Sequence, residues 1–258
     1  MIPKIIHYCW FGRNPLPELA LRCIESWKKF LPDYEIKEWN EDNFDVNIIP
    51  YTAQAYKAKK YAFVSDYARF WILYQYGGVY FDTDVEVIKP MEEFIKQGSF
   101  MGCENGADGG GLRVAPGLGL GVESGSELYK EILDKYASFS FYNSDGSMNI
   151  TTVVQYVTGI LKNRGLKESP DIQIVSGCHI CPKDYLCPKS YEDGKSYLTD
   201  NTYCIHDFAD SWNPWYVNLE GTIWRFLGCT PHRYSYHLVE FLKKPFRGKK
   251  HANNNNNL

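Results

Sequence analysis

The chain has 258 residues, of which 44% are apolar and 16% aromatic, and its formal net charge is −3. A chain of this length can bury the core of one large α/β domain or of two small ones. The net negative charge argues against a nucleic-acid partner held by general electrostatics. No apolar run reaches the roughly 18 to 20 residues of a membrane-spanning helix, and residues 1–7 do not form a secretory signal. These features predict a cytoplasmic globular protein.

The eight cysteines are spread along the chain without the dense spacing of a disulfide framework, so we expect reduced thiols. Cys178, Cys181 and Cys187 have a spacing typical of half of a zinc site. No second pair of ligands follows at finger spacing, and Pro182 and Pro188 favour extended loop segments. The sequence therefore favours a structural interpretation of these cysteines.

The N-terminal part of the chain predicts a strand–helix–strand unit. Residues 4–10 are typical of a buried strand, residues 16–31 have apolar side chains at helical spacing, and residues 34–39 alternate between apolar and polar. Such a unit opens a parallel sheet.

Two helices, at residues 54–60 and 65–76, and a strand at 79–81 are expected next. Ser65 is the predicted N-cap of the second helix, and Gly77 ends it.

Later segments predict further strands at residues 85–88, 99–104 and 118–122, and helices at 126–139 and 151–161. The glycine-rich loop between the last two strands has no phosphate-cradling pattern, so it is not expected to anchor a phosphate.

The most informative segment is residues 63–84, in which a helix, a glycine pair and a short strand precede two carboxylates. Asp66 and Arg69 share one helix face, because they are one turn apart. Asp82 and Asp84 follow the strand, at the edge where α/β folds bind ligands. Carboxylates suit Mg²⁺ or Mn²⁺ carrying a phosphorylated substrate, and an arginine fork suits phosphate or sugar hydroxyls. The segment therefore predicts an enzyme that handles a metal-bound diphosphate.

The array Ser65-Asp-Tyr-Ala-Arg69 … Tyr76-Gly-Gly-Val-Tyr-Phe-Asp-Thr-Asp84 resembles the DXD-containing sugar-binding region of family-32 glycosyltransferases, which include capsular-polysaccharide transferases. Residues 2–12 and 204–212 resemble that family's first strand and closing loop, so the resemblance spans about residues 2–215. It implies an α/β fold of the GT-A type: a single domain over residues 1–220, with a Rossmann-like mixed sheet flanked by helices.

The resemblance also implies a nucleotide-sugar donor, a divalent cation (Mn²⁺ or Mg²⁺) and roles for individual residues. The residues expected to bind the nucleotide-sugar are His7, Trp10, Asp66, Arg69, Tyr80, Asp82, Thr83, Ser211 and Trp212. Those expected to be catalytic are Asp82, Asp84 and Arg69. Asp84 is the expected direct metal ligand, with Asp82 beside it.

The closing loop departs from the family pattern. Many members read His-His-x-x-Gly-Ser-Trp, whereas this chain has His206, Asp207 and Asp210 before Ser211 and Trp212. Either His206 or Asp207 is expected to complete the metal site, and a structural role for His206 is the alternative.

Asn149, Thr152 and Gln155 lie where such enzymes place substrate-contacting residues, although Thr152 is also a good helix cap.

The implied activity is transfer of a hexose, with retention of anomeric configuration, to a polysaccharide or lipid-linked glycan. A UDP-sugar is the first expectation for the donor, and GDP-mannose is the second. One alternative is an aspartyl phosphatase or phosphotransferase that uses the first aspartate of the DxD as nucleophile. Another is a non-catalytic module that binds nucleotide-sugars.

Residues 221–258 are expected to form a basic extension. Residues 233–250 carry six basic side chains interleaved with apolar ones, and residues 252–258 are an asparagine-rich, disordered end. The basic segment fits either an amphipathic helix on the anionic inner face of a membrane or a solvated helix packed on the domain.

Overall fold

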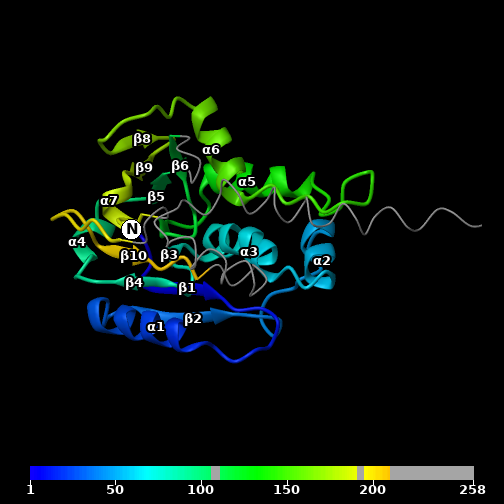
Figure 1. Cartoon of the computed structure of the whole chain (residues 1–258), viewed down its shortest axis with the longest axis horizontal. Coiled ribbons are helices and arrows are strands. Elements are labelled where there is room, and N and C mark those ends of the chain that lie inside the picture. The colour runs from blue at the N-terminus through cyan, green and yellow to red at the C-terminus, as the bar shows by residue number, and fades with distance from the viewer. Residues whose placement is uncertain (106–110, 191–194, 210–258) are drawn as a thin grey trace, which may run out of the picture.

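The computed structural model describes residues 1–105, 111–190 and 195–209 (Figure 1). Its centre is an eight-stranded sheet in the order β2-β1-β3-β7-β5-β9-β8, with β6 paired to β5. The strands are β1 (Ile5–Cys9), β2 (Glu35–Trp39), β3 (Gly78–Tyr80), β5 (Phe100–Asn105), β6 (Leu112–Val114), β7 (Leu120–Val122), β8 (Gln173–Val175) and β9 (Cys178–Cys181). Strand β1 is parallel to β2 and β3, whereas β7 is antiparallel to β3 and β5. The predicted mixed α/β sheet is confirmed.

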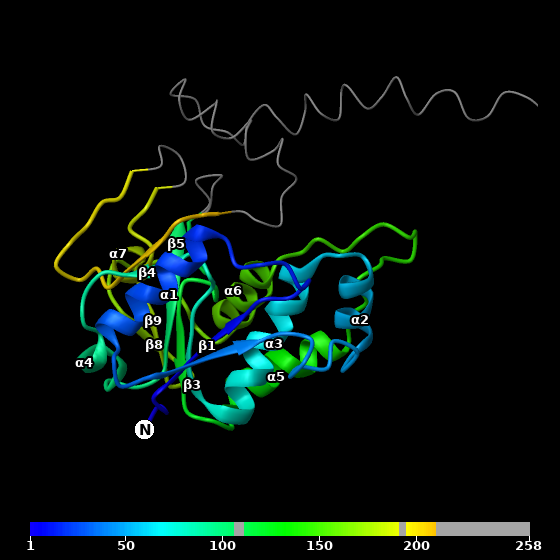
Figure 2. The same ribbon diagram turned by 90° about the horizontal axis from the view of Figure 1, so that it is seen from below.

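Helices cover both faces of the sheet (Figure 2). They are α1 (Glu18–Phe30), α2 (Pro50–Lys57), α3 (Tyr61–Tyr76), α4 (Glu92–Ile95), α5 (Glu127–Ala137), α6 (Val153–Asn163) and α7 (Lys183–Leu186). One buried cluster contains side chains of α2, α3, α5 and α6, and a second contains side chains of α1, α4 and α7. The sheet therefore separates two apolar cores, as expected for a domain whose sheet is buried on both faces.

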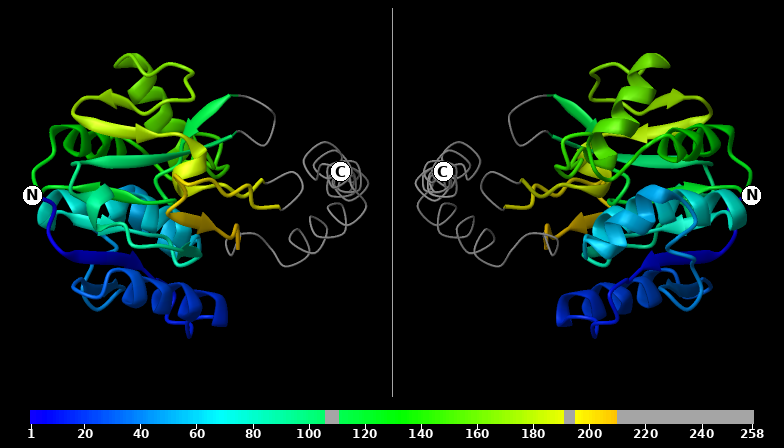
Figure 3. Two further views of the ribbon diagram at one scale, coloured as in Figure 1. Left: turned by 90° about the vertical axis from the view of Figure 1, so that its left-hand side faces the viewer. Right: turned by 90° about the vertical axis from the view of Figure 1, so that its right-hand side faces the viewer.

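A second, two-stranded sheet pairs β4 (Val85–Val87) with β10 (Cys204–His206) in antiparallel register. His206 is opposite Val85, directly after Asp84. Strand β10 lies on the side of the molecule opposite the N-terminus (Figure 3). This ribbon brings the chain around residue 206 to the end of the segment that carries Asp82 and Asp84.

Two helices begin four residues earlier than predicted. Helix α3 begins at Tyr61, so Ser65 is inside the helix, where its hydroxyl donates to the carbonyl of Tyr61 at 3.3 Å. A serine can return a hydrogen bond to the preceding turn and thus be tolerated in a helix. Helix α2 begins at Pro50, which occupies the first turn, where a missing amide hydrogen is harmless.

The segment from Cys178 to Cys181 is strand β9, between β5 and β8, rather than the extended loop that the flanking prolines indicated. Both thiols are buried and reduced. Over the residues described, no group of three or more His, Cys, Asp or Glu side chains is placed to enclose a metal ion. The same ranges contain no helix long and apolar enough to cross a membrane.

Candidate active site

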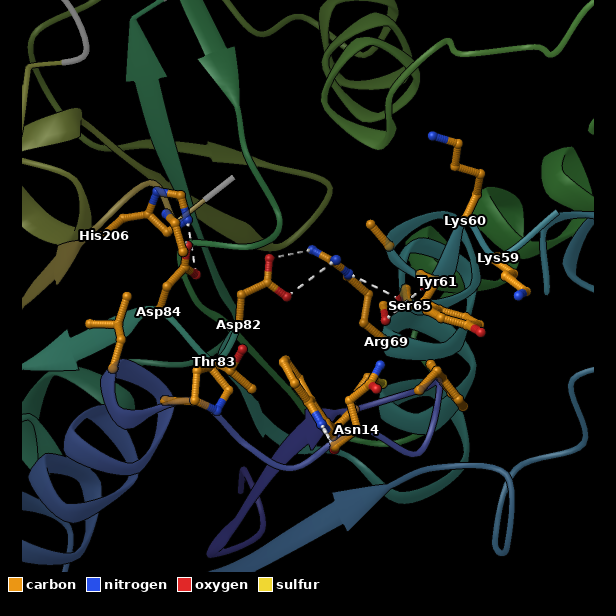
Figure 4. Close-up of a pocket in the computed structure, with 18 residues that line it drawn as sticks. Asn14, Lys59, Lys60, Tyr61, Ser65, Arg69, Asp82, Thr83, Asp84 and His206 are labelled. Atoms are coloured by element: carbon orange, nitrogen blue, oxygen red, sulfur yellow. Dashed lines mark hydrogen bonds and ion pairs between the residues drawn. The ribbon is translucent and has the colours of Figure 1, made fainter. Parts of the chain in front are cut away.

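A cavity of about 370 Å³ opens at the carboxyl ends of β1 and β3 (Figure 4). Its volume is within the range of small-molecule sites. The predicted site residues that line it are Trp10, Arg69, Asp82, Thr83, Asp84 and His206. They come from the end of β1, from α3, from the β3–β4 connection and from β10, so the fold gathers side chains that are far apart in the sequence.

Arg69 is the centre of one half of the site. One guanidinium nitrogen is 3.0 Å from Asp66 and 3.3 Å from Asp82, and the arginine side chain is 4% exposed. Burial raises the pKa of Asp66 to about 6, although Arg69 acts in the opposite direction. Burial also raises the pKa of Asp82, again opposed by Arg69. The arginine therefore compensates two buried carboxylates and fixes the position of Asp82.

Tyr80 and Asp66 support this half of the site from outside the cavity. The Tyr80 hydroxyl donates to Asp82 Oδ1 at 2.9 Å, and its ring, 1% exposed, lies beneath the Arg69 guanidinium. Tyr80 was expected to bind the nucleotide-sugar; in the structure its hydroxyl holds Asp82, and a contact with the donor stays a prediction. Asp66 lies behind Arg69 and is not among the lining residues. Its contact with a donor sugar stays a prediction.

Asp84 is the centre of the other half. Its Oδ1 is 3.2 Å from His206 Nε2, and its Oδ2 accepts a hydrogen bond of 2.9 Å from the amide of Ala209. Burial alone would raise the pKa of Asp84, but His206 and this amide lower it to about 2. Burial lowers the pKa of His206, but the combined attraction of Asp84 and Asp82 raises it to about 9. Asp84 is thus held ionised at neutral pH.

The side chains present fit a divalent cation that keeps much of its coordination shell for substrate and water. Asp84 and Asp82 supply hard oxygen donors, and Mg²⁺ commonly binds through one or two carboxylates plus substrate phosphates. Within the described ranges, His206 Nδ1 is buried without a hydrogen-bond partner, so this ring has one nitrogen uncommitted. Asp84 and Asp82 are therefore the residues that would hold the ion, and a part for His206 stays a prediction, because beside Asp84 its ring carries a proton.

Asp207 does not join them. Its side chain forms ion pairs with Lys189 at 2.8 Å and Arg22 at 2.9 Å, and it does not line the cavity. The expectation that either His206 or Asp207 completes the metal site stays a prediction, and in the structure both carboxylate oxygens of Asp207 have cationic partners.

His7 was expected to bind the nucleotide-sugar, but it lies in the core, 1% exposed. The Trp39 indole donates to His7 Nδ1 at 3.0 Å, so Nε2 carries the hydrogen, which it donates to the carbonyl of Gly77 at 2.9 Å. Burial lowers the pKa of His7 to about 4, so the ring is neutral. His7 therefore stabilises the turn between α3 and β3 through its hydrogen bond to Gly77. This turn connects the helix that carries Arg69 to the strand that precedes Asp82.

The glycines of that turn are required by the backbone and by space. Gly77 and Gly78 have φ values of 65° and 106°. A Cβ atom on Gly78 would lie 2.7 Å from the carbonyl oxygen of Ile5. This close approach to β1 places the Asp82 end of β3 directly beside Trp10.

Trp10 is half-buried, and its indole nitrogen donates to the carbonyl of Asn14 at 2.6 Å. The ring is thus held against the cavity wall, consistent with stacking on a flat ligand. Ser211 and Trp212 lie outside the described residues.

Sequence reasoning missed several groups around the cavity. Gly117 packs directly against Asp82, and its carbonyl accepts the Asp82 amide at 3.1 Å. Lys59 and Lys60 line the wall opposite Asp84 (Figure 4). Lys59 has a φ of 57°, a conformation that favours glycine. Such outliers concentrate at binding sites, and this was not readable from residue type.

Asn149, Thr152 and Gln155 have structural partners. Thr152 caps α6, and its amide donates to the Gln155 side chain at 3.0 Å, forming a capping box. Asn149 donates to the Tyr156 hydroxyl at 3.1 Å. A substrate contact for these three residues stays a prediction.

Residues 17–101 match the family described as "Glycosyltransferase sugar-binding region containing DXD motif". "Inositol phosphoceramide mannosyltransferase 1" of Schizosaccharomyces pombe is 29% identical over 111 residues, 39% of this chain and 33% of the relative. "Inositol phosphoceramide mannosyltransferase 3" of the same yeast is 36% identical over 98 residues, which are 36% of this chain and 27% of the relative. "Uncharacterized glycosyltransferase L373" of Acanthamoeba polyphaga mimivirus is 34% identical over 106 residues, which are 39% of this chain and 42% of the relative.

The matched part thus covers less than half of the length of these curated relatives. Among solved structures, "PaToxG Glycosyltransferase" aligns with a TM-score of 0.48 and 20% identity, over 63% of this chain and 69% of its own.

Proposed function

We propose that the chain, whose residues 17–101 match the DXD-containing glycosyltransferase sugar-binding region, is a metal-dependent, retaining hexosyltransferase of the family-32 type that uses a nucleotide-sugar donor. The observation that carries the proposal is the convergence of Arg69, Asp82 and Asp84 in one cavity beside Trp10. A cation–carboxylate cluster next to an aromatic wall suits a donor that combines a nucleobase, a diphosphate and a sugar.

In this mechanism the chain's residues bind and orient, and none forms a covalent intermediate. Asp84, ionised, and Asp82 would hold the divalent cation, and Arg69 keeps Asp82 in place from behind. When bound, the cation neutralises the charge that develops on the leaving diphosphate. The bond from the anomeric carbon to phosphate oxygen breaks, and a bond to the acceptor oxygen forms on the same face. The acceptor proton passes to the departing phosphate, so no protein base is needed.

A phosphotransferase that uses Asp82 as nucleophile is disfavoured by the same contacts. Both oxygens of Asp82 are engaged by Arg69, at 3.3 Å in each case, and Oδ1 also accepts from Tyr80. A carboxylate held in this way is poorly placed to attack a phosphorus atom.

The donor is proposed as a UDP-hexose or GDP-mannose, and the acceptor as a capsular or other polysaccharide, or a lipid-linked glycan. The names of the two fission-yeast relatives specify mannosyl transfer and inositol phosphoceramide. These names support including GDP-mannose and an anionic lipid-linked acceptor in the assay.

The test is release of nucleoside diphosphate from a panel of UDP- and GDP-sugars, with and without Mn²⁺. We expect turnover with one donor, loss of turnover after chelation, and loss in Asp84→Asn by about 10²-fold or more. The matched control is Asp134→Asn, which removes an exposed carboxylate from α5, where it pairs with Lys130. Phosphate release from simple monoesters would overturn the proposal, and donor binding without turnover with any acceptor or water would favour a binding module.

We also propose that the protein acts in the cytoplasm at the inner face of a membrane, to which residues 233–250 bind. These residues lie outside the described ranges, and their six basic side chains support the proposal. Vesicles containing anionic lipid are expected to retain the full chain better than a chain truncated at Gly228. Equal retention would contradict it.

A further inference from the structure

Asp207 is the one predicted metal ligand that turns away from the cavity, and its surroundings are specific. Its Oδ1 is 2.8 Å from the ammonium of Lys189, and its Oδ2 is 2.9 Å from the guanidinium of Arg22 on α1. Lys189 also donates to the backbone carbonyl of Asp207 at 3.1 Å. Asp207 and Lys189 are 18% and 21% exposed. A carboxylate shared by two cations in a partly buried place has a more fixed geometry than an isolated surface pair.

The backbone at Asp207 contacts the active-site aspartate directly. The Asp207 amide donates to the carbonyl of Asp84 at 2.9 Å, which extends the β4–β10 ladder by one bond. The next residue, Phe208, has a φ of 51°, a conformation that is strained for a bulky side chain. This turn directs the amide of Ala209 onto Asp84 Oδ2 at 2.9 Å.

The loop therefore needs a restraint. A residue held in the left-handed region raises the free energy of that conformation, which persists only when surrounding contacts impose it. Two such contacts are present. The Phe208 ring packs edge-on against His206, with centroids 4.5 Å apart, and the Asp207 side chain is fixed from two sides by α1 and by the chain before residue 190.

We infer that Arg22, Asp207 and Lys189 form a clamp that holds the turn at residues 207–209 and so places His206 and the Ala209 amide on Asp84. Asp207 is then a positioning residue and not a metal ligand. The consequence for catalysis rests on the proposed function, whereas the clamp itself is a property of the free protein.

A metal-binding titration with Mn²⁺ alone separates the clamp from direct ligation. Asp207→Asn is expected to weaken Mn²⁺ affinity by about 10-fold, the size seen when supporting groups of a metal site are removed. Arg22→Met and Lys189→Met are each expected to weaken it in the same direction. A ligating Asp207 predicts the opposite for these two variants, because removing a competing cation frees the carboxylate. Unchanged or tighter Mn²⁺ binding in both would overturn the inference.

Hydrogen exchange of the amides of Asp207 and Ala209 gives a readout that needs neither metal nor substrate. Both amides donate to Asp84, and we expect each to exchange several-fold faster in Asp207→Asn and Lys189→Met than in the wild type. The matched control is Glu25→Gln, which removes an exposed carboxylate from the same helix α1, where it pairs with Lys28. Exchange in Asp207→Asn no faster than in this control would refute the clamp. If the wild type binds no Mn²⁺, the metal-dependent function fails while the exchange result still decides the clamp.

Discussion

Replacement of Gly117 by alanine tests whether the position of Asp82, rather than its charge alone, matters for activity. Gly117 is in the connection between β6 and β7, and it has no positive φ that alanine would resist. A Cβ atom there would lie 3.1 Å from Asp82 Cγ and closer still to Oδ2, and 3.3 Å from Arg69 Nη1. Comfortable separations between non-bonded heavy atoms are about 3.5 Å, and Oδ2 is the nearest atom, so the carboxylate has to retreat by about 1 Å or more.

A displacement of that size is expected to reduce kcat/KM for donor turnover by about 10²-fold. The fold should survive, because the added methyl group meets a side chain that faces a cavity and not the core. The assay is the initial rate of nucleoside diphosphate release, with thermal unfolding measured beside it. Gly159→Ala is the matched control, since nothing lies within 4 Å of its new Cβ in helix α6. Alanine there should stabilise the folded protein by about 1 kcal/mol without changing the rate of donor turnover. A Gly117→Ala enzyme as active as wild type, while Asp82→Asn is inactive, would refute the reasoning.

Three further predictions concern stability and are measured by urea unfolding. Folded His7 has a pKa of about 4 against an ordinary 6.5, so the unfolded chain binds the extra proton as pH falls. The stability of wild type relative to His7→Gln should therefore fall by about 2 kcal/mol from pH 7.5 to pH 5, and a pH-independent difference would contradict this. Lys59→Gly should stabilise the folded protein by about 1 kcal/mol, because glycine adopts the φ of 57° without strain. Lys57→Gly, at the end of α2, should destabilise the folded protein, because glycine is a poor helix former. A change of the same sign in both variants would contradict backbone strain at Lys59. Arg69→Met should destabilise by about 3–5 kcal/mol, because Asp66 and Asp82 lose their cation; a loss below 1 kcal/mol would show that water reaches them.

The central motif was predictable because its information is local. Apolar spacing marks α3, the glycine pair marks its end, and Asp82 and Asp84 follow a strand, so their place at the sheet edge follows from chain order. The resemblance then supplied the type of site. The class of the sheet and the proximity of Arg69 to Asp82 could both be predicted from the sequence.

Other features depend on contacts that no local pattern encodes. His7 has the residue type of a ligand-binding group, but register places it toward Trp39 and Gly77, in the core. Asp207 is chemically a good metal ligand, and only the folded structure shows that Arg22 and Lys189 form ion pairs with its two oxygens. Residue type indicates what a side chain can bind, whereas tertiary packing decides what it meets.

The two halves of the site are joined to the fold by very different lengths of chain. Arg69 and Asp82 are 13 residues apart, linked through one helix end and one glycine turn. Asp84 and Ala209 are 125 residues apart, and β10 belongs to a separate two-stranded ribbon, a unit of marginal stability by itself. Loosening of that ribbon removes the supports of Asp84 while the Arg69–Asp82 pair stays assembled. One wall of the cavity is therefore joined by contacts between neighbouring elements, and the other depends on a contact across 125 residues of sequence.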